Sequence, residues 1–175
     1  PSVHLFSQSR GKLRFDPALD AFVPDQPVQA TRSAGAANGR YDLSEILAEG
    51  FAAGSAAAGN SASRTFTATP TPTGFWPVRV LPTDADPARI KAFIDFQNDV
   101  TAKDIHLAVR EGFESVEHVK RYTTTGMATD QGKSSNMNAL GIVAGILDKA
   151  LPAVGTTTFR PPYTPVTFGT LIGPS

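Results

Sequence analysis

Three features are missing from this 175-residue sequence: cysteine, an excess of either charge, and any long apolar run. Without cysteine the chain can form neither a disulfide framework nor a thiolate-ligated zinc or iron–sulfur site. Its 16 basic residues balance 16 acidic residues, so it has no electrostatic footprint for nucleic acid or an anionic membrane. No apolar run approaches the ~18 residues that a bilayer span needs. We therefore expect no nucleic-acid or membrane partner, and a cytoplasmic location.

The N-terminus, PSVHLFSQSRG, has neither an initiator methionine nor the charged-then-apolar pattern of a signal peptide. We interpret the chain as an internal piece of a longer protein. Residues 1–30 alternate in a strand-like way, and residues 12–15 are expected to pair with residues 21–23 in a hairpin. Asp42, with an acidic residue three positions later, is typical of a helix start, and apolar spacing predicts a helix from about 43 to 58.

The middle of the chain changes character. Proline recurs throughout residues 61–92, so this connector is expected to be extended. Its stretch 75–78 is too apolar for a free linker and is expected to pack on a neighbouring surface. Residues 93–151 predict three helices, which begin after Thr101, after Ser115 and at about residue 136. The apolar stripe expected on the third helix, from 136 to 150, consists of Met137, Leu140, Ala144, Leu147 and Leu151.

The tail, residues 152–175, is Pro-rich and reads as extended. The fold class is therefore α+β: a β-hairpin and a helix, then a small three-helix module with extended Pro-rich flanks.

The stretch YTTTGMATDQGKSSN at 122–136 holds almost no core-forming residue, and long loops of this kind are usually functional or disordered. Its Gly-Lys-Ser at 132–134 resembles the end of a nucleotide-binding P-loop. That motif needs glycine five positions before Gly132, where Met127 stands, and it follows a strand rather than the helix predicted here. The P-loop interpretation is therefore excluded.

A weaker anion site remains possible, because Gly132, Lys133 and Ser134 precede a predicted helix whose free N–H groups favour negative charge. The alternative is that Ser135 only caps the helix and Lys133 is solvated. The GAANG segment at 35–39 raises a similar possibility without the full G-x-G-x-x-G spacing.

Other catalytic patterns are weak. The histidines, at positions 4, 106 and 118, show no ligand-like spacing. Asp95 and Asp99 are four apart and could share a face for acid–base work. Turn-making or capping around Asn98 is the alternative use of these two carboxylates.

Four stretches carry a resemblance to a known family: HLFSQSRGKLRFD (4–16), FIDFQNDVTAKDI (93–105), VEHVKRYTTTGMATDQGKSSNMNALGI (116–142) and TTFRPPYTPVTFG (156–169). Together they resemble the alpha subunits of heterotetrameric sarcosine oxidases. The resemblance implies that residues 1–60 close a FAD/NAD-type dinucleotide-binding domain. It also implies that the connector leads to a helical module at 93–151, and the tail to a folate-binding domain.

By the same resemblance, the parent enzyme demethylates sarcosine oxidatively to glycine, using FAD, FMN, NAD and tetrahydrofolate. The amine-oxidising flavin belongs to the beta subunit, so this chain is expected to be non-catalytic and to bind no cofactor alone. The FMN is expected at the alpha–beta interface, near the Thr- and Gly-rich loop. The cofactor contacts expected from these considerations are Gly35, Asn38, Thr125, Gly132, Lys133 and Ser134.

The helical module also resembles the bacterioferritin-associated-ferredoxin-like domains, which hold a 2Fe–2S cluster on four cysteines. Their ligand positions fall here on Asp95, Gln97, Asp130 and Ser135, so the resemblance implies the scaffold without its cluster. Asp130 and Gln131 are then expected to bond backbone amides, with Ser135 capping the third helix.

Two other interpretations remain open. The chain could be a pure interaction module that binds no cofactor, or it could belong to a related opine or amino-acid dehydrogenase complex.

Overall fold

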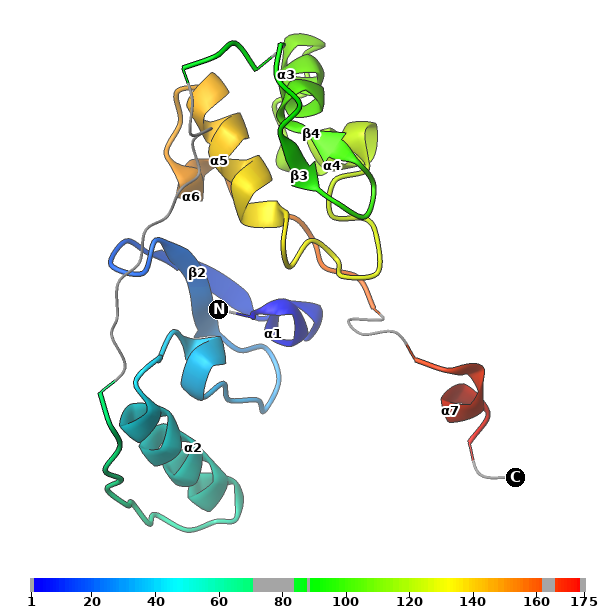
Figure 1. The fold of residues 1–175 in the computed structure, drawn as a ribbon. Helices are drawn as coiled ribbons and strands as arrows, with labels where there is room; N and C mark the ends of the chain where they lie inside the picture. The colour runs from blue at the N-terminus through cyan, green and yellow to red at the C-terminus, as the bar shows by residue number, and fades with distance from the viewer. Residues whose placement is uncertain (1, 71–83, 88, 162–165, 174–175) are drawn as a thin grey trace. The chain divides into compact units, whose positions relative to one another are not determined.

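The computed structural model describes residues 2–70, 84–87, 89–161 and 166–173. The chain divides into two compact units, residues 1–77 and 78–175. Both units contain helices and a small antiparallel sheet, which confirms the α+β prediction (Figure 1). The apolar stretch predicted to pack at 75–78 lies outside the described residues. None of the helices in the described part of the chain has the length and apolarity that a bilayer crossing requires.

The first unit is built around a hairpin. Its elements are α1 (His4–Gln8), β1 (Lys12–Asp16), β2 (Ala21–Gln26), the 3-10 helix η1 (Gly35–Asn38) and α2 (Leu43–Ala57). Strands β1 and β2 pair antiparallel with Phe15 opposite Phe22, as the sequence predicts. The two rings meet edge to face with centroids 5.3 Å apart. The Asp16 carboxylate accepts the amides of Ala18 and Leu19, the first of the turn.

The strand-like alternation predicted at the N-terminus is wrong for α1, which is a short helix. Val3 and Phe6 are buried while Leu5 is exposed, which is the i, i+3 period of a helix rather than the period of two of a strand. The Phe6 ring packs against Gly11, where a Cβ would lie only 2.4 Å from it. The close contact between this ring and the following backbone selects the helical arrangement.

Helix α2 begins as predicted, and it ends one residue earlier than predicted. The side chain of Asp42 accepts hydrogen bonds from the amides of Ser44 at 3.0 Å and Glu45 at 3.3 Å. No residue of α2 is buried, although Leu43, Leu47 and Phe51 form its apolar stripe. The helix therefore carries a largely exposed apolar face, on which Phe51 meets the ring of Phe66 with centroids 6.2 Å apart.

The second unit contains the helical module. Its elements are β3 (Phe93–Asp95), β4 (Val100–Thr101), α3 (Ala102–Arg110), α4 (Val116–Thr123), α5 (Asn136–Ile146), α6 (Leu151–Val154) and α7 (Phe168–Ile172). Helix α3 packs against both α4 and α5 (Figure 1). The predicted cap at Thr101 is confirmed as a reciprocal capping box with Asp104. The buried core comprises Ile94, Val100, Ala102, Ile105, Ala108, Val119, Ala139 and Val143.

Three predictions about this unit need correction. Helix α5 ends at Ile146 rather than near residue 150, because the backbone leaves the helix at Asp148 with φ 50°. The buried stripe contains Leu140 and Ala144 as predicted, together with Ala139 and Val143, and the predicted Leu147 packs partly buried against the same core. The tail is not wholly extended, since it includes the short helices α6 and α7.

Candidate functional site

The loop between α4 and α5 meets the β3–β4 turn, and together they form what we call the polar loop site: residues 124–135 with Asp95 and Gln97. Helix α4 ends at Thr123, and the next residue, Thr124, has a φ of 65° that turns the chain sharply. The hydroxyl of Thr123 donates to the carbonyl of Val119 at 2.8 Å and accepts the amide of Thr125 at 3.2 Å. The start of the loop is therefore fixed by side chains of the preceding helix.

The carboxylate of Asp95 ties the turn to the loop. It is 2% exposed. One oxygen accepts the amides of Gln97 at 2.9 Å and Asn98 at 3.2 Å, which makes the turn. The other accepts the buried amide of Gly126 at 2.7 Å, across 31 residues of sequence. The turn-making use of Asp95 is therefore confirmed, and both of its oxygens are engaged by N–H donors.

Three further hydrogen bonds join the same two segments. The side-chain oxygen of Gln97 accepts the Thr129 hydroxyl at 3.2 Å and, more weakly, the Asp130 amide at 3.4 Å. The side-chain amide of Asn98 donates to the carbonyl of Thr124 at 2.9 Å. The structure thus brings together the turn positions 95 and 97 and the loop position 130, which the cluster-domain resemblance placed at a common site.

Asp130 organises the second half of the loop. Its carboxylate accepts the amides of Gly132 at 3.0 Å and Ser134 at 3.3 Å, and the Ser134 hydroxyl at 2.8 Å. Desolvation alone would raise the pKa of Asp130, but these hydrogen bonds and the nearby Lys133 charge outweigh it and lower the pKa. The predicted bonding of Asp130 to backbone amides is confirmed, as is that of Gln131, which accepts the Arg160 amide at 3.0 Å.

This arrangement changes the candidate anion site. The amides of Gly132 and Ser134, which the sequence offered to an anion, already bond a carboxylate of the chain itself. Lys133 and Ser134 are exposed, whereas Thr125 is buried, with its hydroxyl 2.9 Å from that of Thr123. Lys133 is therefore the principal positive group that this loop presents at its surface.

The predicted cap by Ser135 is wrong. Ser135 is fully buried, and its hydroxyl has no hydrogen-bond partner among the described residues. The serine has a helix-like φ of −111° and ψ of −33°, whereas a capping residue normally has an extended backbone that lets its side chain reach back to the helix amides.

Asn136, which sequence reasoning missed, holds the end of the loop. Its carboxamide lies between Gly126 and Gly132, where an added Cβ would come within 2.4 Å and 2.1 Å of its side-chain oxygen. Both glycines have positive φ. The side-chain nitrogen of Asn136 donates to the Thr157 hydroxyl at 3.0 Å. In the sequence, the two glycines of this polar loop could have indicated the contact, because a glycine lets another group approach its backbone closely.

A strap of the tail closes over α4 and the loop. Lys120 is buried and donates to the carbonyl of Thr158 at 2.8 Å, while Glu117 accepts the Thr158 amide. Desolvation lowers the pKa of Lys120 despite the charge of Glu117. For Glu117 itself desolvation is outweighed by the Thr158 hydrogen bond and two cations, so its pKa is lowered. The tail is thereby attached to the side of the loop that Asn136 also contacts.

The candidate residues of the first unit lie on η1. The side chain of Glu49, from α2, accepts the Gly35 amide at 2.7 Å and the Asn38 side-chain nitrogen at 2.7 Å. Gly35 has a φ of 66°, which favours glycine. Asn38 and Glu49 also line a hollow of about 210 Å³ together with Thr31, Arg32 and Ser33. Sequence reasoning missed Glu49, which fixes both residues predicted to approach a cofactor.

Comparison with known proteins decides the family. Residues 89–173 match the family described as the sarcosine oxidase A3 domain. The sarcosine oxidase alpha subunit of Corynebacterium sp. strain P-1 is 43% identical over 182 residues, which covers 99% of this chain and 19% of that protein. The chain belongs to the sarcosine oxidase alpha-subunit family. A second member, from Rhizobium meliloti strain 1021, is 42% identical over 99% of this chain and 18% of its own length.

The chain thus spans about a fifth of the length of the sarcosine oxidase alpha subunits that it matches. A solved structure, the L-proline dehydrogenase from P. horikoshii, shares the fold with a TM-score of 0.69 and 20% identity. That likeness covers 98% of this chain and 37% of the other chain. It supports the α+β fold from hairpin to helical module.

In this member of the sarcosine oxidase alpha-subunit family, the residues at the four aligned positions do not fit an iron–sulfur cluster. They offer two carboxylates, an amide and a hydroxyl, whereas such clusters require thiolate or imidazole ligands. Both carboxylates also accept backbone N–H groups, so their oxygens already have partners. No group of three His, Cys, Asp or Glu residues suited to a metal ion occurs among the described residues. Hydrogen bonds therefore join the two segments on which the resemblance placed the ligand positions.

Proposed function

We propose that the chain is a central, non-catalytic segment of a sarcosine oxidase alpha subunit. In this role it supports the oxidative demethylation of sarcosine to glycine by a multi-subunit flavoenzyme of the cytoplasm. The parent complex would use FAD, FMN, NAD and tetrahydrofolate, and its beta subunit would carry the amine-oxidising flavin. The proposal is supported by family membership along 99% of the chain.

The observation that carries the non-catalytic assignment is the hydrogen bonding of the polar loop site. Catalytic acids and bases must have an atom available to the substrate. Here the carboxylates of Asp95 and Asp130 accept N–H groups of their own loop and turn. These two carboxylates stabilise the backbone conformation of the loop and turn. The exposed surface of the loop is therefore available for contacts with a cofactor or another subunit.

That surface suits a contact with a flavin phosphate or with the beta subunit. Lys133 is exposed, and Tyr122 and Met127 are 46% and 48% exposed on the same α4–loop segment. Since Asp130 occupies the nearby amides, a phosphate would be met mainly by the Lys133 ammonium group, as a point charge. Thr125, Gly132 and Ser134 would then act by shaping the loop.

On η1, Asn38 would face the dinucleotide through the hollow that it borders, and Glu49 would hold both Asn38 and Gly35 in place. Gly35 would contribute by shaping η1, since its positive φ favours glycine and a Cβ there would lie 3.2 Å from Ile46 of α2.

The test is Lys133→Ala in the complete enzyme complex, with Lys12→Ala as control because Lys12 is an exposed lysine of β1. The proposal expects Lys133→Ala to lower FMN content per complex or the yield of assembled complex, while Lys12→Ala changes neither. Unaltered FMN content together with unaltered assembly would refute the proposed contact.

A second candidate function is an interaction module of a related opine or amino-acid dehydrogenase complex that binds no cofactor itself. The observation that favours it is the same carboxylate of Asp130, which takes the donors that an anionic cofactor would use. FMN content separates the two: an interaction module loses assembly in the Lys133→Ala complex and keeps a full complement of flavin in whatever complex forms.

A further inference from the structure

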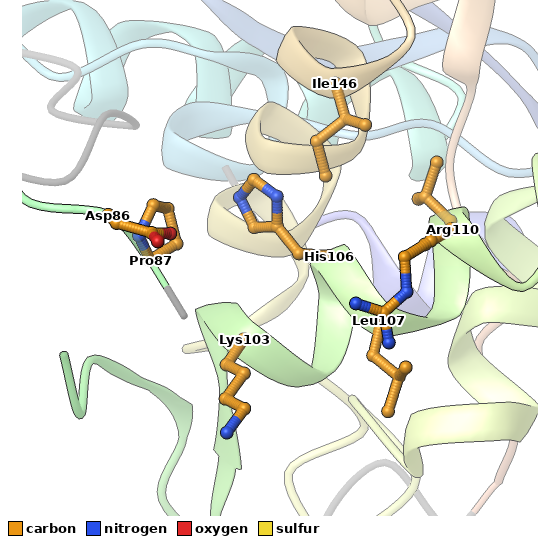
Figure 2. A pocket seen from close by; sticks show the side chains of 8 residues that line it. Asp86, Pro87, Lys103, His106, Leu107, Arg110 and Ile146 are labelled. Carbon is orange, nitrogen blue, oxygen red and sulfur yellow. The ribbon is translucent and has the colours of Figure 1, made fainter. Parts of the chain in front are cut away.

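A hollow of about 380 Å³ opens on the outward face of α3, within the unit of residues 78–175. It shares no residue with the polar loop site or with η1. Figure 2 shows Lys103, His106, Leu107 and Arg110 projecting from α3, with Ile146 of α5 beside them and Asp86 and Pro87 opposite His106. Its volume lies within the range of small-molecule sites.

The rim of the hollow is cationic. Lys103, His106 and Arg110 stand at i, i+3 and i+7, so they share one face of α3. The side chains of Lys103 and His106 make no hydrogen bond or ion pair with any described residue. Within the described part of the chain, Arg110 pairs only with Glu111, at 3.9 Å, and both side chains are exposed. Three basic groups thus gather in a chain whose net charge is zero.

The acidic side chain in the lining does little to offset this charge. Asp86 lies 3.8 Å from the guanidinium of Arg89, and its carbonyl accepts the Arg89 amide at 2.8 Å. Among the described lining residues, Lys103 and Arg110 stand against the carboxylate of Asp86, so the lining keeps a net positive charge. Exposed ion pairs of this kind are weak. An anionic ligand that contacts several cations at once therefore gains more binding free energy than one such pair supplies.

The floor of the hollow is apolar. Leu107, Val109 and Ile146 line it, and Val109 and Ile146 pack against the buried core of the module. An apolar floor attached to a core keeps its shape, which lowers the cost of ordering a ligand. A hollow with cations at one edge and aliphatic groups below matches a molecule that has an anionic head and an apolar body.

We propose that this hollow binds an amphipathic organic anion. Its carboxylate, or a phosphate of equivalent charge, would lie between Lys103, His106 and Arg110, and its hydrocarbon part would cover Leu107 and Ile146. This site goes beyond the proposed function, since that function assigns no ligand to the outer face of α3.

The experiment is a methyl and imidazole NMR titration of the full 175-residue chain with octanoate, following Ile146 and His106. Acetate supplies the head without the body, and octylammonium supplies the body with the opposite charge. Octanoate is expected to cause saturable shifts at both residues, to bind more tightly than acetate, and to weaken as salt is raised. Octylammonium is expected to cause no saturable shift.

Two variants and a control test the cationic rim. Lys103→Ala and Arg110→Ala are each expected to weaken octanoate binding about three- to tenfold, or about 0.7–1.4 kcal/mol. Both residues are exposed, so the fold should be kept. Lys12→Ala, in the other unit, should change nothing.

The proposal is overturned if octanoate gives no saturable shift up to about 10 mM, a range that includes weak small-ligand binding. It is also overturned if octylammonium binds equally well. Full affinity in the Lys103→Ala/Arg110→Ala double variant would likewise show that the rim does not bind an anion.

Discussion

Replacement of Asp95 by asparagine removes one of the two acceptors that join the β3–β4 turn to the α4–α5 loop. The change keeps size and shape and replaces one carboxylate oxygen by an NH₂ donor. The new NH₂ group then points either at the buried Gly126 amide or at the amides of Gln97 and Asn98, so that two donors face each other. The second arrangement costs less, because Gln97 and Asn98 are exposed and can bond water.

The size of the effect follows from these alternatives. A hydrogen bond to a charged group contributes about 1.5–3 kcal/mol, and a buried donor left without a partner costs about 1–3 kcal/mol. If the substituted side chain turns its oxygen toward the Gly126 amide, that hydrogen bond is kept. The loss is then limited to the negative charge of the acceptor and to the hydrogen bonds of the Gln97 and Asn98 amides, which water can replace. We expect Asp95→Asn to lower the free energy of unfolding by about 2–3 kcal/mol.

The assay is urea unfolding followed by far-UV circular dichroism, with hydrogen exchange of the Gly126 amide as the local measure. Asp99→Asn is the matched control, because Asp99 is exposed in the same turn at φ 54°, which asparagine adopts readily. The control should lie within about 0.5 kcal/mol of the parent chain. A loss below about 1 kcal/mol for Asp95→Asn, with unchanged Gly126 protection, would refute the reasoning.

Three further perturbations probe other contacts. Gly132→Ala should destabilise the chain by about 2 kcal/mol more than Gly112→Ala in urea unfolding, since both have positive φ but only Gly132 abuts a side chain. Glu49→Gln should lower protection of the amides at 35–38 in hydrogen exchange by about 1 kcal/mol. Acid should loosen the loop as pH falls below about 4, because the pKa of Asp130 is lowered on folding, and Asp130→Asn should remove that part of the pH dependence.

The outcomes that would contradict these expectations are specific. Equal losses in the two glycine variants would mean that the contact with Asn136 carries no energy. Unchanged protection after Glu49→Gln would mean that η1 is held by its own turn. Because the pKa of Asp130 is lowered on folding, its contribution to stability is complete above the unfolded-state pKa and is lost as pH falls through the folded-state pKa. An Asp130→Asn chain with the same acid profile as the parent would show that another group causes the loss of stability in acid.

Local signals in the sequence predict much of the secondary structure. The hairpin, the Asp42 and Thr101 helix starts and the three helices of the module all follow from periodicity and capping over a few neighbouring residues. The helix at His4–Gln8 was missed because five residues hold too few turns for a helical period to differ from alternation. The end of α5 was missed because a single residue at positive φ leaves no pattern.

The candidate site was harder to predict, because its contacts join distant positions. Asp95 and Gly126 are 31 residues apart, and Gln97 and Thr129 are 32 apart. The family resemblance placed positions 95, 97 and 130 together, and spacing alone did not. Asn136 carried no capping or ligand pattern, so only the packed structure shows that its carboxamide fills the space between two glycines.

The central claim is that this chain supports a sarcosine-oxidising enzyme without supplying its catalytic groups. The most direct measurement is steady-state oxidation by the complete complex, carrying either the parent chain or Lys133→Ala, with sarcosine and with L-proline as substrates. The account predicts glycine and hydrogen peroxide from sarcosine, little turnover of L-proline, and an unchanged kcat per bound FMN in the variant. Preferred oxidation of L-proline, or a lower kcat per bound FMN in a fully loaded variant, would contradict it.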